Sequence, residues 1–192
     1  MKKTILGIAL AISSLTFAQQ KAKASASPVS FGVKAGLNVS SINADDAKAK
    51  AGFYGGVFAN IPVATSFSVQ PEVLYSGMGA KNKDYSSVKL NLDYISVPVM
   101  LQYNVLPELY LEAGPQFSFA ISKKIKGDGG SVDVDNYYKG FDFGVGIGAG
   151  YYIAQGFGVT ARFVAGATDI VENNSGDAIR NNVFQVGVAY KF

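Results

Sequence analysis

The feature that most constrains this chain is the alternation of apolar with small or polar residues, which recurs in eight long segments. One side of each segment is almost purely apolar, while the other side carries glycines, hydroxyls, amides and isolated charges. A period of two residues is typical of a β-strand whose two faces meet different surroundings. The predicted strands cover residues 31–41, 51–61, 66–78, 89–103, 109–122, 139–153, 157–169 and 182–192.

The lengths of these segments and of their connections indicate a membrane protein. Most segments span about 10 to 15 residues, whereas strands of soluble proteins average about 5–6 residues and strands that cross a bilayer need about 9–11. Tight turns follow the second, fourth and sixth segments, and longer polar loops follow the first, third, fifth and seventh. Bacterial outer-membrane barrels separate short turns and long loops to opposite ends in this way.

The pattern therefore predicts an all-β fold, an eight-stranded antiparallel up-and-down transmembrane β-barrel over residues 31–192. The alternative is a soluble lipocalin-like barrel, which would hold its apolar residues inside and its polar residues outside. In the membrane barrel the apolar side faces lipid, and aromatic side chains at the strand ends lie at the two membrane interfaces. The rings predicted there are Phe31, Phe67, Tyr103, Phe157, Tyr190 and Phe192 at the short-turn end, and Phe53, Tyr75, Phe119, Phe141 and Phe184 at the other.

The residues before the first strand have a different composition. Lys2 and Lys3 are followed by a mostly apolar stretch that is too short to span a bilayer, and then by Ala18, a small residue suited to cleavage. We predict a signal peptide over residues 1–18 and a disordered leader over residues 19–30. The chain contains no apolar run of the length of a transmembrane helix, so none is predicted.

Composition argues against several classes of chemistry. The chain has no Cys and no His, so it has no disulfide and lacks the commonest general base and metal ligand. Loss of the two N-terminal lysines with the signal peptide lowers the formal net charge from +3 to about +1, which provides no clustered basic face for nucleic acid. We expect no enzymatic activity, no cofactor, no metal site and no nucleic-acid partner.

Besides Lys191 near the end of the last strand, five charged residues fall on the small and polar side of the predicted strands, which faces the lumen. They are Lys34, Glu72, Glu112, Asp142 and Arg162. Side chains nearly fill the lumen of an eight-stranded barrel, and charges there must be paired and hydrogen-bonded. We predict a lumen charge network that plugs the barrel, and the alternative is a gated pathway in which the pairs exchange partners. The glutamines expected to help are Gln70, Gln102, Gln116 and Gln185.

Two local features of the predicted strands concern the backbone. Pro71, Pro98 and Pro115 lie inside strand patterns, and because proline lacks the N–H of a ladder hydrogen bond, local bulges are expected there. Four glycines alternate along the inward face of the sixth segment. They leave room for large side chains opposite, such as Arg162, Tyr54 or Phe58.

The last predicted strand carries a signal for assembly. The sequence Gln185-Val-Gly-Val-Ala-Tyr-Lys-Phe192 resembles the C-terminal strand of bacterial outer-membrane barrels. We predict that Gln185, Gly187, Tyr190 and Phe192 form an assembly signal for the outer-membrane barrel assembly machinery. The expected location is the bacterial outer membrane, in contact with its lipid and with both barrel termini in the periplasm.

Several short motifs, taken together, point to one family. They are Gly32-Val-Lys-Ala-Gly-Leu-Asn38, Gln70-Pro-Glu-Val-Leu-Tyr-Ser-Gly77, Tyr94-Ile-Ser-Val-Pro-Val-Met-Leu-Gln-Tyr103, Leu111-Glu-Ala-Gly-Pro115 and the run from Ala161-Arg-Phe163 to Asp169-Ile170. With them, residues 30–192 resemble the small outer-membrane β-barrel proteins described as porin family proteins or outer membrane protein beta-barrel domains, which are OmpA/OmpX-like and related to PorT. The resemblance implies a barrel inserted by the assembly machinery, and it implies no reaction. An eight-stranded barrel leaves no wide aqueous channel, so the word porin does not imply transport.

The sequence leaves three functional hypotheses open. The first is a barrel with a plugged polar lumen that acts structurally or through surface contact, especially with its loops Lys123–Tyr138 and Ile170–Asn181. The second is a narrow pore for small solutes or ions. The third is an accessory component of an outer-membrane secretion system. The sequence specifies no surface partner.

Overall fold

The structure is a computed structural model, and it describes residues 28–43, 47–83, 87–127, 130–134, 136–172, 174 and 176–192. The predicted signal peptide lies outside the described residues, and so does the predicted leader up to residue 27. No helix in the described part of the chain is long and apolar enough to cross a membrane.

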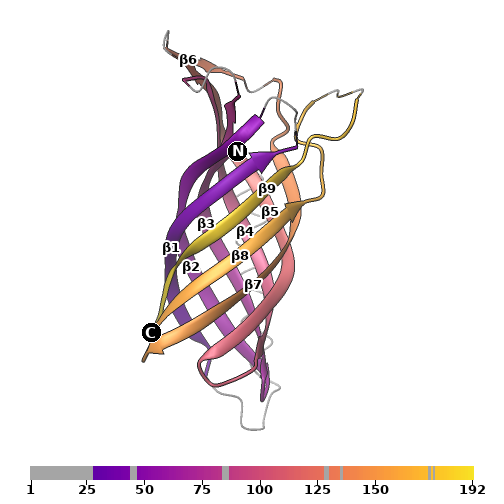
Figure 1. The fold of residues 1–192 in the computed structure, drawn as a ribbon. Coiled ribbons are helices and arrows are strands. Elements are labelled where there is room, and N and C mark those ends of the chain that lie inside the picture. The colour runs from indigo at the N-terminus through magenta and orange to yellow at the C-terminus, as the bar shows by residue number, and fades with distance from the viewer. Residues whose placement is uncertain are drawn as a thin grey trace, which may run out of the picture.

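In the described ranges, eight long antiparallel strands close into a barrel, which confirms the predicted architecture (Figure 1). The strands are β1 (Ser30–Ile42), β2 (Ala47–Ala64), β3 (Phe67–Asn82), β4 (Lys89–Asn104), β5 (Leu109–Gly127), β6 (Gly130–Asp133), β7 (Phe141–Ala154), β8 (Phe157–Gly166) and β9 (Asn181–Lys191). The short strand β6 lies outside the barrel wall and pairs with the end of β5. The last strand, β9, pairs with β1 as well as with β8, and this pairing closes the cylinder.

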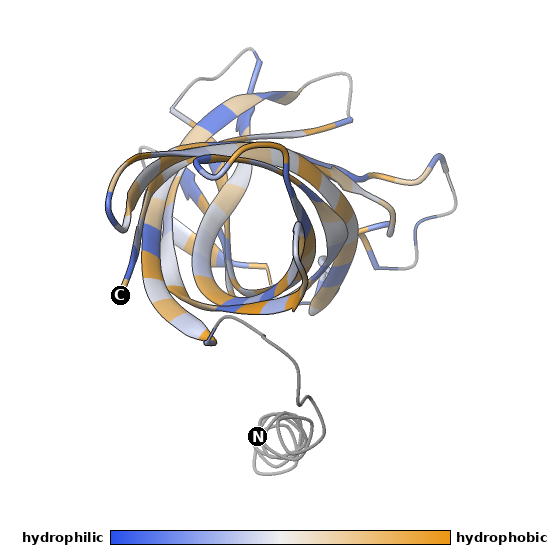
Figure 2. Cartoon of the chain, turned by 90° about the horizontal axis from the view of Figure 1, so that it is seen from below, coloured by the Kyte–Doolittle hydropathy of each residue, from blue (hydrophilic) through white to orange (hydrophobic). Residues whose placement is uncertain are grey.

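The connections separate by length, as the sequence predicts. The turns after β2, β4 and β7 lie together at the lower end in Figure 1, where β9 also ends, and we call this the short-turn end. The longer connections lie at the opposite end, the long-loop end. Figure 2, seen along the barrel axis from the short-turn end, shows the strands as a closed ring.

The apolar side of the wall faces outward and the polar side faces inward. Val145 and Ile147 in β7 are 48% and 60% exposed, whereas Glu112 and Arg162 are 4% and 3% exposed. This is the reverse of a soluble barrel, and so large an apolar surface is stable only when lipid covers it. The aromatic side chains exposed at the strand ends are Phe31, Phe67, Tyr103, Phe157, Tyr190 and Phe192 at the short-turn end, and Phe53, Phe119, Phe141 and Phe184 toward the long-loop end.

The alternation changes phase near the long-loop end. In β4, Ile95 and Val97 face outward like the rest of the lipid-facing wall, but Leu90, Leu92 and Tyr94 face inward and are buried. Apolar residues therefore move from the outer face to the inner face between Tyr94 and Ile95. Beyond this point the wall has the pattern of a water-soluble barrel, with polar residues outside.

We expected a lumen that is polar throughout. The lumen is instead divided into two sections. The section toward the long-loop end is an apolar core of buried side chains. Its members are Met78, Leu90, Leu92, Tyr94, Val134, Val164, Ile170 and Val183. Val134 and Ile170 belong to the long connections, so these connections fold back over the end of the barrel and contribute to its core.

The prolines do not produce the bulges that we expected. Pro71, Pro98 and Pro115 each keep the register of their strand. A proline removes one hydrogen-bond donor but adds no residue, so it leaves the in-and-out alternation intact. The register shifts lie instead toward strand ends, as at Asp93 and Tyr94 between β4 and β5.

Inward glycines provide space for large side chains, in part as predicted. A Cβ on Gly146 in β7 would lie 3.5 Å from Cδ of Arg162, and a Cβ on Gly150 would clash with the ring of Tyr110. Tyr54, by contrast, packs over glycines of β1 and β9, where a Cβ on Gly36 or Gly187 would lie 2.8 Å or 2.5 Å from its side chain. Close approach of a ring to the backbone therefore explains these glycines.

The substitution Ile147→Arg tests whether the outward apolar side chains lie in lipid. A charge in the middle of the lipid-facing wall should lower the free energy of unfolding by about 2–4 kcal/mol in a bilayer. The matched control is Val132→Arg in β6, which is 66% exposed but lies beyond the barrel wall and should cost less than about 0.5 kcal/mol. Urea titration of protein refolded in phospholipid vesicles, with the folded fraction read from gel mobility without boiling, measures both. Equal costs for the two variants would contradict the lipid-facing assignment.

Candidate functional site

The strongest candidate site is a cluster of four charged side chains in the polar section of the lumen. Its centre is Glu72, which lies on the inward face of β3 and is 1% exposed. Lys34 on β1 donates from Nζ to Glu72 Oε1 over 2.8 Å. Gln70, which shares the inward face of β3, donates from Nε2 to the same oxygen over 2.9 Å.

Arg162 on β8 joins Glu72 to Glu112 on β5. Its Nη1 and Nη2 donate to Oε2 and Oε1 of Glu72 over 2.9 and 2.8 Å, which is a bidentate pair. Its Nε donates to Oε1 of Glu112 over 2.7 Å, and Gln102 Nε2 donates to the remaining Glu112 oxygen over 3.0 Å. The planar guanidinium suits this arrangement, and every carboxylate oxygen of the two glutamates has a donor.

The cluster is neutral and buried. It contains two cationic and two anionic side chains, each at most 4% exposed. Moving a charge out of water costs several kcal/mol, and ion pairing offsets this cost only when the geometry is good and the remaining oxygens are hydrogen-bonded. The cluster meets both conditions, and it connects β1, β3, β5 and β8 across the lumen.

Asp142, the fifth charged residue of the predicted network, lies apart from the other four. Its carboxylate accepts a hydrogen bond from Thr168 Oγ1 over 2.8 Å, at the start of β7 near the long-loop end. Gly148, the residue of β7 that pairs with Arg162, is six positions further along the strand, which is about 20 Å at 3.3 Å per residue. Asp142 therefore shares the inward face with the cluster but not its height in the barrel.

A neutral polar layer adjoins the charged cluster. Gln70 and Gln102 support the glutamates as predicted, but Gln185 on β9 donates instead to Oδ1 of Asn38 over 3.0 Å. Asn38 in turn donates to Ser76 Oγ over 2.9 Å. Asn38 has no distinguishing signal in the sequence, because an inward asparagine carries no charge that demands a partner.

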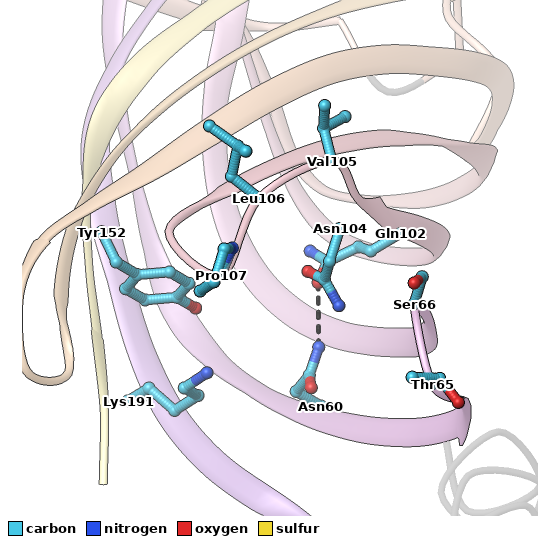
Figure 3. Close-up of a pocket in the computed structure, with 10 residues that line it drawn as sticks. All are labelled: Asn60, Thr65, Ser66, Gln102, Asn104, Val105, Leu106, Pro107, Tyr152 and Lys191. Atoms are coloured by element: carbon cyan, nitrogen blue, oxygen red, sulfur yellow. Dashed lines mark hydrogen bonds between the residues drawn. The ribbon is translucent and has the colours of Figure 1, made fainter.

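A cavity of about 370 Å³ opens at the short-turn end of the polar section (Figure 3). Asn60 donates to Gln102 Oε1 over 2.8 Å at this cavity, and Gln102 continues the chain of hydrogen bonds to Glu112. Lys191 Nζ lies 4.4 Å from the centre of the Tyr152 ring, within cation–π range. The charged cluster is therefore approached from this end through hydrogen-bonded amides.

The opposite end is closed by the long connections, which bind to one another. Tyr138 and Val171 form a β-bridge between the β5–β7 and β8–β9 connections, and Ile170 beside it is 1% exposed. Asp169 accepts hydrogen bonds from the N–H groups of Val171 and Ile179 over 3.0 and 3.2 Å. The N–H of Val171, foremost among these contacts, holds the pKa of the Asp169 carboxyl below its ordinary value.

The side chains of the cluster can pair with one another and fill the lumen. Both glutamates are engaged by cations and amides, so neither is a free general base or nucleophile. In the described part of the chain, no three His, Cys, Asp or Glu side chains lie close enough together to hold a metal ion.

These features define a membrane-spanning β-barrel whose interior is occupied by its own side chains. The family described as outer membrane protein beta-barrel domain matches residues 17–172, and the chain belongs to this family. It is therefore a transmembrane β-barrel protein of the bacterial outer membrane. No curated protein matches the chain.

Solved structures with the same fold include two bacterial proteins. One is Ail, the attachment invasion locus protein of Yersinia pestis, with 14% identity and a TM-score of 0.54. The other is Neisserial surface protein A, with 16% identity and a TM-score of 0.60. Each comparison covers 86% of this chain and 100% of the other. At these identities the likeness shows the fold alone.

The substitution Arg162→Met tests the cluster, because it removes the side chain that joins the two glutamates. The free energy of unfolding should fall by about 3–5 kcal/mol, since buried carboxylates are left short of a cation. The double variant Arg162→Met with Glu112→Gln keeps only the neutral Lys34–Glu72 pair in the cluster. It should therefore recover most of the lost free energy of unfolding. Urea titration in vesicles measures each variant, with Arg180→Met at an exposed arginine as the control. A loss at Arg162 no greater than at Arg180 would rule out the proposed role of the pairing.

Proposed function

We propose that this protein is a non-conducting outer-membrane barrel that acts through the surface presented by its long loops. In this proposal the long-loop end faces the exterior of the cell and both barrel termini lie in the periplasm, which is the usual orientation for barrels with this asymmetry of loop length. The proposal assigns no reaction to the protein.

The observation that carries the proposal is the filling of the lumen by two unlike layers in series. The charged cluster around Glu72 and Arg162 occupies the polar section, and the apolar core occupies the section toward the long loops. A permeating ion would have to separate buried charge pairs and then cross an apolar layer without its hydration shell. An apolar solute would be compatible with the apolar layer but not with the charged cluster. Passage is therefore unfavourable for ions and for apolar solutes.

The long-loop end has the properties of a contact surface. The bridge between Tyr138 and Val171 joins the two longest connections, and Asp169 binds the N–H groups of Val171 and Ile179 within the second of them. On this framework, Val132 and Tyr137 are 66% and 71% exposed beyond the barrel wall. Exposed aromatic side chains such as Tyr137 are favoured anchors for protein recognition, and Val132 adds apolar surface beside it.

The structural relatives support the fold on which this proposal rests, but they do not identify a partner. A crystal structure of Ail holds the heparin analogue sucrose octasulfate, and it is 15% identical to this chain with a TM-score of 0.53. A shared fold at this identity does not transfer a ligand. The proposed contact role therefore depends on the loops of this chain.

The contact role predicts that two exposed loop residues matter and that matched residues at the other end do not. The double variant Val132→Ser with Tyr137→Ser should bind its surface partner at least about tenfold more weakly, because an aromatic anchor such as Tyr137 can contribute about 2 kcal/mol or more. Val105→Ser with Leu106→Ser, at exposed apolar residues of the β4–β5 turn, should change nothing. Vesicles that carry the refolded protein, applied to arrays of extracellular proteins and glycans, give the comparison. An unchanged pattern for the loop variant would contradict contact through these residues.

The narrow pore is the second candidate, because the cavity of about 370 Å³ at the short-turn end leads toward the charged cluster. Planar-bilayer recordings of the purified protein separate the two functions. We expect no steady openings for the wild type, because its lumen is filled. The Val132→Ser, Tyr137→Ser variant should behave in the same way, because its two substitutions lie outside the lumen. Steady openings of the wild type would exclude the plug and establish the pore.

We also propose that Gln185, Gly187, Tyr190 and Phe192 are the signal through which the assembly machinery binds the chain. Two observations support this. Tyr190 and Phe192 are 45% and 75% exposed on the outer wall, and their rings lie 5.4 Å apart in an edge-to-face contact. Their strand forms both the β8–β9 and the β1–β9 pairings, so it completes the barrel.

The assembly role predicts that Phe192→Ala lowers the fraction of protein inserted in cells several-fold. The same variant, refolded in vesicles, should lose no more than about 1 kcal/mol of stability, because Phe192 packs only at the rim. Phe157→Ala is the control, since Phe157 is another exposed ring, 40% exposed, at the same end of the barrel. Equal insertion of the two variants would remove the argument for a terminal signal.

A further inference from the structure

A basic groove lies on the outer wall where the lipid-facing surface ends. It is a cavity of about 500 Å³ over β2 to β5, and its lining includes Lys50, Lys124 and Lys126. Phe53 and Tyr75 also line it, and their rings lie 5.2 Å apart. The groove thus joins ammonium groups to the aromatic border of the membrane wall.

The wall is hollow here because of its backbone. Gly52 and Gly77 line the groove without side chains, and the pairing of β2 with β3 shifts register in this region. Lys50 is 9% exposed and donates from Nζ to the backbone oxygen of Met78 over 2.7 Å. Across the described residues, no carboxylate lies within ion-pair distance of Lys50. One buried ammonium group therefore keeps donors for a ligand.

The surroundings of the groove carry excess positive charge. Lys81, Lys89 and Lys126 each repel the Lys50 ammonium, whereas Asp93, which itself lines the groove, attracts it more strongly than any one of them repels it. Lys124 lies 3.5 Å from Asp133, but these side chains are 44% and 67% exposed, and an exposed pair of this kind contributes only about 0–1 kcal/mol. Five lysines and two aspartates of the described chain thus leave an anion-attracting wall.

The position of the groove favours a lipid over a soluble polyanion. Below it, Val57 and Val73 are 54% and 45% exposed on the same two strands, in the lipid-facing wall. The lysines lie along the side of the barrel at the height where the apolar residues of β4 turn from outside to inside. A lipid whose acyl chains pack on the valines would place its headgroup at this height, where lysines favour anionic lipids.

We propose that this groove binds the phosphate of a membrane lipid headgroup while the acyl chains of that lipid pack on the apolar wall below. Lysine ammonium groups suit a phosphate as point charges that adapt to its position. The binding itself does not depend on the proposed orientation of the barrel. That orientation decides only that the lipid comes from the outer leaflet.

Native mass spectrometry of the full barrel in detergent micelles tests the proposal with two lipids that differ only in phosphate. The wild type should retain dimyristoyl phosphatidic acid at least about tenfold more tightly than dimyristoyl glycerol. The double variant Lys124→Gln with Lys126→Gln should weaken retention of the phosphatidic acid by roughly ten- to thirtyfold, since each lysine near a membrane surface contributes about fivefold. Lys139→Gln with Arg180→Gln removes two positive charges from the same end outside the groove and should leave retention unchanged.

Each other outcome overturns the proposal. Equal retention of the two lipids, or equal loss in the two double variants, would mean that the groove does not recognise a headgroup phosphate. Displacement of the phosphatidic acid by excess inorganic phosphate would indicate a site for a free anion. Binding of heparin without retention of phosphatidic acid would assign the groove to a soluble polyanion. None of these readouts depends on Val132, Tyr137 or conductance, so the proposed function is tested separately.

Discussion

The structure depends on one constraint, which is that every backbone N–H and C=O group in hydrocarbon must be paired within the protein. The pairing of β1 with β9 satisfies it, with a register that runs from Gly32 opposite Lys191 to Ile42 opposite Asn181. Closure with this number of strands leaves a lumen that only side chains can occupy. The composition of the inward face follows, because each charge there needs a partner and rings such as Tyr54 and Phe58 lie directly against glycines.

The two sections of the lumen meet this constraint in different ways. Where the wall is surrounded by lipid, the inward face is polar, and Glu72 and Arg162 satisfy one another across the centre. Where the wall rises beyond the lipid, the outward face becomes polar and the inside is packed like a soluble core around Leu92 and Ile170. The barrel thus has one section suited to lipid surroundings and one suited to water. The long connections are attached to the section that resembles a soluble protein.

The sequence predicts the faces of the strands well and their heights poorly. Alternation placed Lys34, Glu72, Glu112 and Arg162 inside, and closure then brought them into contact. It placed Asp142 inside too, but a period of two residues carries no information about the stagger between strands that separates Asp142 from the others. The family resemblance likewise predicted the barrel but not the structure of its loops.

The apolar section has a signal of its own in the sequence. Leu90, Leu92 and Tyr94 alternate in the opposite phase to Ile95 and Val97, and this inversion marks the height at which the surroundings change from lipid to water. The hollow beside Lys50 had no such signal, because it follows from a register shift between β2 and β3 that depends on how the two strands settle against their neighbours.

The central cluster also has a consequence for the order of events during folding. Its cations and anions are far apart along the chain, since Glu72 and Arg162 are separated by 90 positions and Glu112 and Arg162 by 50. Until β8 arrives, Glu112 has no cationic partner and must stay hydrated, so an unfinished barrel keeps water in its centre. The interior can therefore lose its water only once β8 is in place, which links burial of the charges to completion of the wall.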